Sequence, residues 1–196
     1  MNVFNALIRA ASESGEPAAV LPEYAPLLLL LPLGGFLITA AIGRRLGKLA
    51  HIVPLLAIVA TWALSMSLAV PALLGDFGEA GASRELFTWI ASGDLTFSIG
   101  IHVDALTGAL LLVVTTVGAL VHLYSVGYMS HDPGYWRFFA YLNLFMFSML
   151  LLVLASNLLV VFAAWELVGL SSYLLIGFWY TKRDPGLAAK KAFITN

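Results

Sequence analysis

The sequence contains no cysteine and few charged residues. The lack of cysteine in all 196 residues excludes disulfides, thiol nucleophiles and Cys-ligated iron–sulfur clusters within this chain. Only 11% of the residues are Asp, Glu, Lys or Arg, whereas a soluble domain carries about 25%. The net charge of −1 provides no basic surface, so nucleic acid is not an expected partner. No phosphate-binding glycine loop, dinucleotide fingerprint or His-rich metal motif occurs, and we therefore expect neither a cofactor nor a metal ion in this chain.

Long apolar runs take the place of the missing charges. Hydrophobic residues make up 61% of the chain, and about 17–25 apolar residues in a row are enough for a helix to cross a bilayer. A run from Phe138 onward is too long for one span, and Ser156-Asn157 is its most polar break. The sequence therefore predicts an all-α integral membrane protein with five transmembrane helices: Tyr24–Gly43, Ile52–Gly75, Ala105–Gly127, Phe138–Ala155 and Leu158–Tyr180.

Two further elements are expected outside these five helices. Apolar and polar residues alternate from Leu95 to Val103, which is the period of a β-strand, and Ser92-Gly93-Asp94 precedes them as a turn. Residues 85–104 therefore predict an external β-hairpin between the second and third helices. Leu187–Asn196 starts an apolar helix of about two turns, too short to cross a membrane. We read it as the start of a sixth helix, and expect the chain to be the N-terminal fragment of a longer protein.

The charges in the connections predict an orientation in the membrane. Cytoplasmic connections are enriched in Lys and Arg. Eight of the ten basic residues fall on one side of the predicted bundle: Arg44, Arg45, Lys48, Arg137, Lys182, Arg183, Lys190 and Lys191. That side is predicted to be cytoplasmic (or matrix), with residues 1–23 forming an N-terminal external segment and 24–134 holding the first three helices and the hairpin.

Glu166 is the main candidate for a functional residue. No other Asp, Glu, Lys or Arg occurs between Phe138 and Thr181, and an unpaired charge at bilayer depth costs several kcal/mol. Steps of three and four residues place Ala163, Gly169, Tyr173 and Gly177 on its helical face, where the glycines would admit a partner helix. We therefore expect Glu166 to point into protein, with the opposite face (Val160, Leu167, Leu174 and Phe178) suited to lipid.

Two readings of this carboxylate follow. Glu166 is either a proton-relay site, paired with a cation from outside these helices, or a residue that only fixes helix packing. Tyr173 offers a supporting hydroxyl on the same face. His122 lies near the cytoplasmic end of the third helix, where it is a candidate for a proton path or an ordinary hydrogen-bonded side chain.

The sequence also resembles a known family. The stretch WELVGLSSYLLIGFWY, preceded by PGYWRFFAYLNLFMFSMLLLVLASNLLVVF and followed by KKAFITN, is similar to the antiporter-like subunit called L in bacterial and 5 in mitochondrial respiratory complex I. The likeness extends upstream through LFTWIASGDLTFSIGIHVDALT and HLYSVGYM, and so covers most of the chain from Glu85.

The resemblance implies a proton-translocating membrane-arm subunit of NADH:quinone oxidoreductase. Residues 135–196 would then start the antiporter-like helical repeat. In this family a Glu on the fifth helix pairs with a Lys on a later, broken helix; the Glu corresponds to Glu166, and the Lys would lie beyond Asn196. The resemblance implies that other subunits bind NADH, flavin, iron–sulfur clusters and quinone. It also implies partners in the membrane arm, above all the adjacent antiporter-like subunit, and a bacterial plasma membrane or inner mitochondrial membrane.

Other functions remain open. The large subunit of multi-subunit Na⁺/H⁺ antiporters, or of a related ion-translocating complex, shares the Glu and the fold, so both H⁺ and Na⁺ stay possible as the transported ion. A structural membrane-anchor subunit that does not pump would tolerate Gln at position 166.

Overall fold

The computed structural model of the protein describes residues 19–92 and 95–196. Five helices in this part of the chain are long and apolar enough to cross a membrane. They are α2 (Leu27–Leu46), α3 (Ile52–Leu74), α4 (Ala105–Tyr128), α5 (Tyr135–Leu154) and α6 (Leu158–Ile176). A short 3-10 helix, η1 (Gly47–Leu49), extends α2, and α7 (Arg183–Thr195) follows α6. The predicted five spans and the start of a sixth helix are confirmed.

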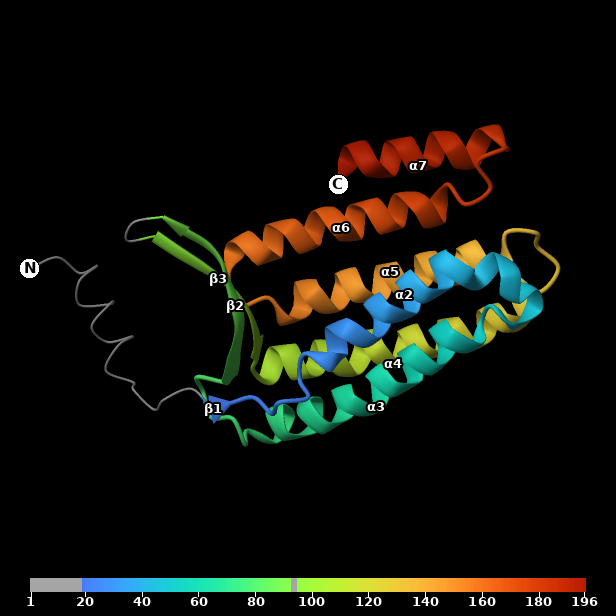
Figure 1. Cartoon of the computed structure of the whole chain (residues 1–196). Helices are drawn as coiled ribbons and strands as arrows, with labels where there is room; N and C mark the ends of the chain where they lie inside the picture. The colour runs from blue at the N-terminus through green and yellow to red at the C-terminus, as the bar shows by residue number, and fades with distance from the viewer. Residues whose placement is uncertain (1–18, 93–94) are drawn as a thin grey trace, which may run out of the picture.

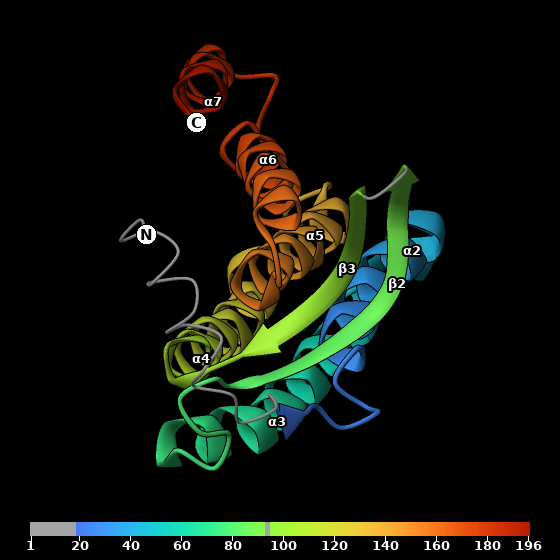
Figure 2. The same cartoon turned by 90° about the vertical axis from the view of Figure 1, so that its left-hand side faces the viewer.

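The helices lie side by side and alternate in direction, so that their connections gather at two ends of the bundle (Figure 1). Helix α4 packs along α3, α5 along α2, α6 on α5 and α7 on α6. Viewed along the bundle, α7 is outermost and α6 lies between α7 and α5 (Figure 2). The α2–α3, α4–α5 and α6–α7 connections share the end opposite the sheet. Of the eight basic residues expected on this side, Lys48 and Lys182 lie in these connections, and Arg44, Arg45, Arg137 and Arg183 lie in the adjoining helix turns. Lys190 and Lys191 lie further along α7.

A small sheet lies across the other end of the bundle. Strands β2 (Ala82–Ser92) and β3 (Leu95–Val103) pair antiparallel, from Ala82 opposite Val103 to Ser92 opposite Leu95. The predicted hairpin between the second and third spans is therefore confirmed, although its first strand begins at Ala82 rather than at residue 85. The two residues at its tip, 93 and 94, and the N-terminal segment 1–18 lie outside the described residues.

A third strand was not predicted. Strand β1 (Ala19–Val20) pairs in parallel with β2, in the order β1-β2-β3. Arg84 fixes the chain that follows β1 by donating a hydrogen bond from its guanidinium to the Leu21 carbonyl oxygen at 3.1 Å. The last part of the predicted external segment 1–23 is thus an edge of the sheet, and α2 begins at Leu27 rather than at residue 24.

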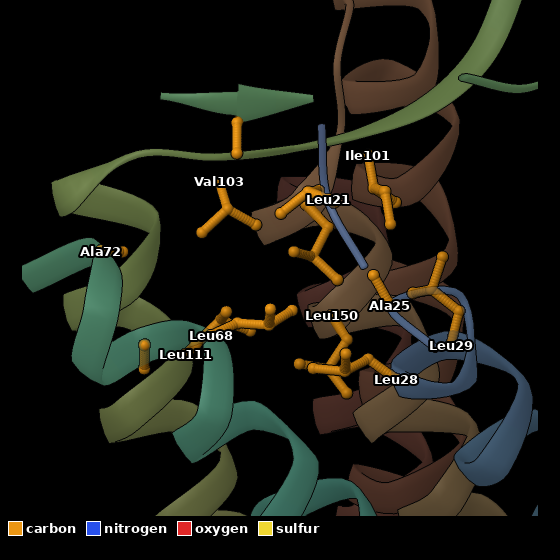
Figure 3. Packing of buried hydrophobic residues seen from close by; sticks show 13 residues of the cluster. Leu21, Ala25, Leu28, Leu29, Leu68, Ala72, Ile101, Val103, Leu111 and Leu150 are labelled. Atoms are coloured by element: carbon orange, nitrogen blue, oxygen red, sulfur yellow. The ribbon is translucent and has the colours of Figure 1, made fainter. Parts of the chain in front are cut away.

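The sheet is held to the helix ends by an apolar core (Figure 3). Ile101 and Val103 of β3 point into it together with Leu21, and all three are at most 1% exposed. The helices contribute the remaining side chains of this cluster, among them Leu28, Leu68, Leu111 and Leu150. Since removing such a side chain from water contributes about 1.5–3 kcal/mol, the sheet and the four helices α2–α5 are stabilised as one unit.

Polar residues at the helix ends explain where the spans start. Asp104 caps α4 by accepting a hydrogen bond from the Thr107 backbone N–H at 2.7 Å, and Asn157 caps α6 by accepting one from the Val160 N–H at 3.0 Å. Both residues are of the types that favour the N-cap position. At the end of α3, Gly75 adopts the left-handed conformation with φ 84°, which an L side chain rarely adopts. The chain therefore turns sharply into the sheet at this point.

Candidate functional site

Glu166 lies in line with the seam between α6 and α7. Helix α7 runs back along α6: Ala189 lies at Gly177, the Phe193 ring is 5.6 Å from the Tyr173 ring, and the Asn196 side chain lies against Gly169. A side chain three residues before Gly169 lies on the same face, one turn further along α6. That residue is Glu166. The predicted partner-helix face of α6 does hold a helix, and Glu166 lies about one turn of α6 from the contact between Asn196 and Gly169.

Within residues 19–92 and 95–196, the predicted burial of Glu166 is not seen. Its side chain is exposed, as is that of Trp165 beside it. Among the described residues, Asn196 is the contact of the α7 segment at Gly169 of α6. The sequence reveals which face of α6 Glu166 shares with the glycines, and the structure shows that α7 packs on this face.

The predicted lipid face of α6 is wrong for two of its residues. Val160 and Phe178 are 4% and 3% exposed, and the Phe178 ring lies 5.2 Å from the Phe138 ring, edge to face. Helix α6 is therefore packed between α5 and α7. Because lipid tails and a protein interior are equally apolar, the sequence pattern of a spanning helix does not distinguish a lipid-facing side from a buried one.

Tyr173 is half-buried, and its ring contacts α7 through Phe193. It lies two turns from Glu166 along the same face of α6, at the covered end of the seam. The helical turn that carries Gly169 therefore lies between Tyr173 and Glu166. The supporting role for Tyr173 stays a prediction.

His122 lies in a different place from Glu166, inside the bundle on α4. It is 1% exposed and has hydrogen-bond partners on both ring nitrogens. Nδ1 lies 2.8 Å from the Gly118 carbonyl oxygen, and Nε2 lies 3.1 Å from Asn143 Nδ2 on α5. A carbonyl only accepts and an amide nitrogen only donates, so Nδ1 carries the proton and Nε2 accepts. His122 is thus a neutral side chain that connects two helices, and its role in a proton path stays a prediction.

Sequence reasoning missed Asn143, which is fully buried and joins His122 to α5. The available signal was an amide side chain in the middle of a span without charges, which must find a hydrogen-bond partner in the membrane. Among the described residues, no group of three or more His, Asp or Glu side chains is arranged to hold a metal ion.

Two family models match the chain. Residues 89–139 match the model described as "NADH-Ubiquinone oxidoreductase (complex I), chain 5 N-terminus", and residues 155–196 match "NADH:quinone oxidoreductase/Mrp antiporter, TM". NADH-quinone oxidoreductase subunit L from Mycobacterium tuberculosis (strain ATCC 25618 / H37Rv) is 45% identical over 174 residues, which cover 89% of this chain. The chain belongs with the antiporter-like membrane subunits of complex I.

A second relative agrees with this assignment. Chloroplastic NAD(P)H-quinone oxidoreductase subunit 5 from Zygnema circumcarinatum is 47% identical over 153 residues, or 78% of this chain. The chain spans only 28% of the length of the Mycobacterium tuberculosis relative and 21% of the Zygnema one.

One solved structure shares the fold. A chain in the structure of the membrane-bound sulfane sulfur reductase, an archaeal respiratory membrane complex, is similar with a TM-score of 0.66. The similarity covers 88% of this chain and 34% of that one at 18% sequence identity. At this identity the likeness supports the arrangement of helices and sheet, and the chemistry must be argued from the residues.

Proposed function

We propose that this chain acts in the proton-translocating membrane arm of an NADH:quinone oxidoreductase, with Glu166 as a proton-holding carboxylate. The observation that carries the proposal is the position of Glu166: it is the one charged residue between Phe138 and Thr181, and it lies in line with the α6–α7 seam. A carboxylate at bilayer depth costs several kcal/mol unless it is paired or protonated. An ionised Glu166 is therefore costly at this depth, and its place in line with the α6–α7 seam fits a group that changes its protonation state during turnover.

The pairing cation is proposed to be a lysine that this chain does not supply. At about 4 Å and an effective dielectric constant near 20, such a pair contributes about 4 kcal/mol, or about a thousandfold in an equilibrium constant. Movement of the lysine toward or away from Glu166 would therefore favour loss or uptake of a proton. His122 is proposed as a secondary group on a proton path through α4, and Tyr173 as a support for water or hydroxyl contacts along the seam.

The experiment is the substitution Glu166→Gln in the complete membrane complex. Glutamine keeps the shape and the hydrogen bonding but cannot release a proton, so proton translocation into proteoliposomes and quinone-linked turnover should fall at least tenfold. Assembly and NADH oxidation by a soluble acceptor should stay unchanged. Glu166→Asp, which still titrates but is shorter, should retain more activity than Gln.

Glu79→Gln is the matched control, because Glu79 is an exposed carboxylate in the connection between α3 and the sheet. It should pump like the wild type. If Glu166→Gln pumps as well as the Glu79→Gln control, Glu166 is a packing residue and the relay proposal is wrong. That outcome is also the one expected of a structural membrane-anchor subunit.

A second candidate function is ion translocation in a multi-subunit Na⁺/H⁺ antiporter. It is favoured by the description of the model that matches residues 155–196, which covers both quinone oxidoreductases and Mrp antiporters. The two functions differ in their ion and energy source. Transport driven by NADH and independent of Na⁺ supports the first, whereas Na⁺/H⁺ exchange without NADH supports the second.

The proposed function also implies partner subunits and a membrane location for the chain. We propose that NADH, flavin, iron–sulfur clusters and quinone are bound by other subunits, and that the partners of this chain are other membrane-arm subunits, including an adjacent antiporter-like one. The chain is a multi-pass membrane protein by its five apolar helices. The bacterial plasma membrane, or the inner mitochondrial membrane, is the proposed location, with the sheet end outside and the basic connections on the cytoplasmic or matrix side.

A further inference from the structure

Arg137 lines a cavity between α5, α6 and α7, at the end of the bundle opposite the sheet (Figure 1). Tyr141 of α5, Tyr173 of α6, and Gly186 and Ala189 of α7 form other parts of its wall. The cavity has a volume of about 220 Å³, whereas one water molecule requires only about 10–15 Å³. A Cβ on Gly186 would meet nothing within 4 Å, so the space is open on the side of α7. The cavity is therefore large enough for a phosphate group.

Two aromatic rings hold the Arg137 guanidinium at this cavity. Its Cζ lies 4.9 Å from the centroid of the Phe178 ring and 5.0 Å from that of the Tyr180 ring. Both distances are within the range of about 6 Å over which a cation interacts with an aromatic face. The rings fix the position of the positive charge but do not accept conventional hydrogen bonds. The N–H groups of the guanidinium therefore still require acceptors.

The protein supplies little to accept these hydrogen bonds. Among the described residues, the acceptor found for Arg137 is the Phe178 carbonyl oxygen, 3.4 Å from Nη2, which is longer than the usual 2.7–3.2 Å. Asp132 lies near by, but its Oδ1 accepts from the Gly134 N–H at 2.7 Å and its Oδ2 from the Trp179 indole N–H at 2.8 Å. A half-buried guanidinium, which has five N–H groups and is always charged, thus borders an open cavity.

The position of Arg137 along α5 places it at the level of lipid headgroups. Helix α5 has 20 residues, which at 1.5 Å per residue is about 30 Å, the thickness of the hydrocarbon core. Arg137 is in the first turn of this helix, at the boundary of that core. Trp179 and Tyr180 are 40% and 68% exposed at the same end, and Trp and Tyr are enriched at this boundary. The acceptors that a membrane offers at this level include lipid phosphate oxygens.

The charges around the cavity favour a headgroup with net negative charge. Lys182 and Arg183 are exposed in the connection from α6 to α7 and in the first turn of α7. Together with Arg137 they outnumber Asp132 and Asp184, the carboxylates of the two connections at this corner of the bundle. Basic pockets between spanning helices are a recurring way of binding anionic lipid headgroups.

We propose that the phosphate group of an anionic phospholipid binds in this cavity, with the Arg137 guanidinium as its main hydrogen-bond donor. A planar guanidinium can donate two parallel hydrogen bonds to phosphate oxygens, which a lysine cannot do. The site requires only that the chain spans a membrane, as its five apolar helices indicate. It is separate from Glu166 and does not depend on the proposed relay at that residue.

The test is photolabelling of the complete membrane complex in nanodiscs with a phosphatidylglycerol analogue that carries a diazirine in its headgroup. Mass spectrometry should find the label on residues 135–141 and 173–189 of the assembled wild-type complex. Arg137→Gln should reduce this labelling about tenfold, the effect of losing charge-assisted hydrogen bonds. Arg137→Lys keeps the charge but not the planar group, and should retain part of the labelling. Arg45→Gln is the control, because Arg45 is an exposed cation at the same end that does not line the cavity, and it should label like the wild type.

Competition identifies the ligand. Unlabelled phosphatidylglycerol should displace the analogue more effectively than phosphatidylcholine, whose phosphate charge is balanced by choline, and inorganic phosphate should not displace it. Displacement by inorganic phosphate would assign the cavity to a free anion and overturn the lipid proposal. A wild-type complex without label on these two segments, or equal labelling of Arg137→Gln and Arg45→Gln, would also overturn it. Each outcome is independent of whether Glu166→Gln affects pumping.

Discussion

Asn157 connects the sheet to the first turn of α6. Its Nδ2 donates to the Ser98 carbonyl oxygen of β3 at 2.7 Å, while its Oδ1 accepts from the Val160 N–H at 3.0 Å. A second backbone contact lies beside it, where Ile101 and Ala155 form an isolated β-bridge. One side chain therefore both starts the helix that carries Glu166 and holds the hairpin over the bundle.

Asn157→Asp separates these two roles. Aspartate still caps α6 but cannot donate to Ser98, whereas Asn157→Ala loses both bonds. We expect a loss of about 1 kcal/mol for Asp and about 2 kcal/mol for Ala in the free energy of unfolding. In hydrogen exchange, both variants should expose the amides of β3 more than the wild type does. Equal exchange in all three proteins would show that the Asn157–Ser98 bond does not hold the hairpin.

Gly35→Ala should disturb the α2–α5 seam while Gly34→Ala does not. A Cβ on Gly35 would lie 2.5 Å from Asn143 Oδ1 and 3.0 Å from Ala57 Cβ, whereas a Cβ on Gly34 meets nothing within 4 Å. Overpacking of this kind costs about 1–3 kcal/mol. Thermal unfolding in detergent should therefore show a lower Tm for Gly35→Ala and an unchanged or slightly raised Tm for Gly34→Ala. Similar values for the two variants would contradict the close packing of α2 and α5.

Asp104 should make the structure sensitive to acid. The hydrogen bond from the Thr107 backbone N–H holds the pKa of its carboxyl below the usual value of 3.8. A carboxyl with a lowered pKa in the folded state stabilises the protein fully above the unfolded pKa, and this contribution is lost as the pH falls through the folded pKa. Stability should therefore decrease below about pH 4.

Asp104→Asn is the matching variant, since Asn is an equally good N-cap that does not titrate. Its thermal unfolding should show a smaller decrease in Tm between pH 5 and pH 3 than that of the wild type. If both proteins lose the same stability over this range, the acid sensitivity resides in other carboxyls.

The two ends of the bundle should face opposite sides of the membrane. The chain has no cysteine, so single cysteines at the exposed positions Arg45 and Glu79 give clean labelling sites. An impermeant thiol reagent should label Arg45→Cys from the cytoplasmic side and Glu79→Cys from the other side. The unsubstituted chain serves as the control without signal. Labelling of both from one side would contradict the alternating spans.

The sequence by itself determined the number of spanning helices, their approximate ends and the hairpin between the second and third of them. These features depend on local patterns: runs of about 20 apolar residues, a strand alternation of period two, and the polar break at Ser156-Asn157. It also singled out Glu166, because a lone carboxylate in an apolar run is visible without any structure.

The tertiary structure decided which faces of the helices meet. Val160 and Phe178 are buried rather than exposed to lipid, β1 (Ala19–Val20) joins the sheet, and Asn143 pairs with His122 across two helices. In a spanning helix the residues that face lipid are as apolar as those that face protein, so no hydrophobic contrast marks the contacts. These contacts arise from close packing at small residues and from the need of each buried polar atom for a partner, and both depend on residues far apart in the chain.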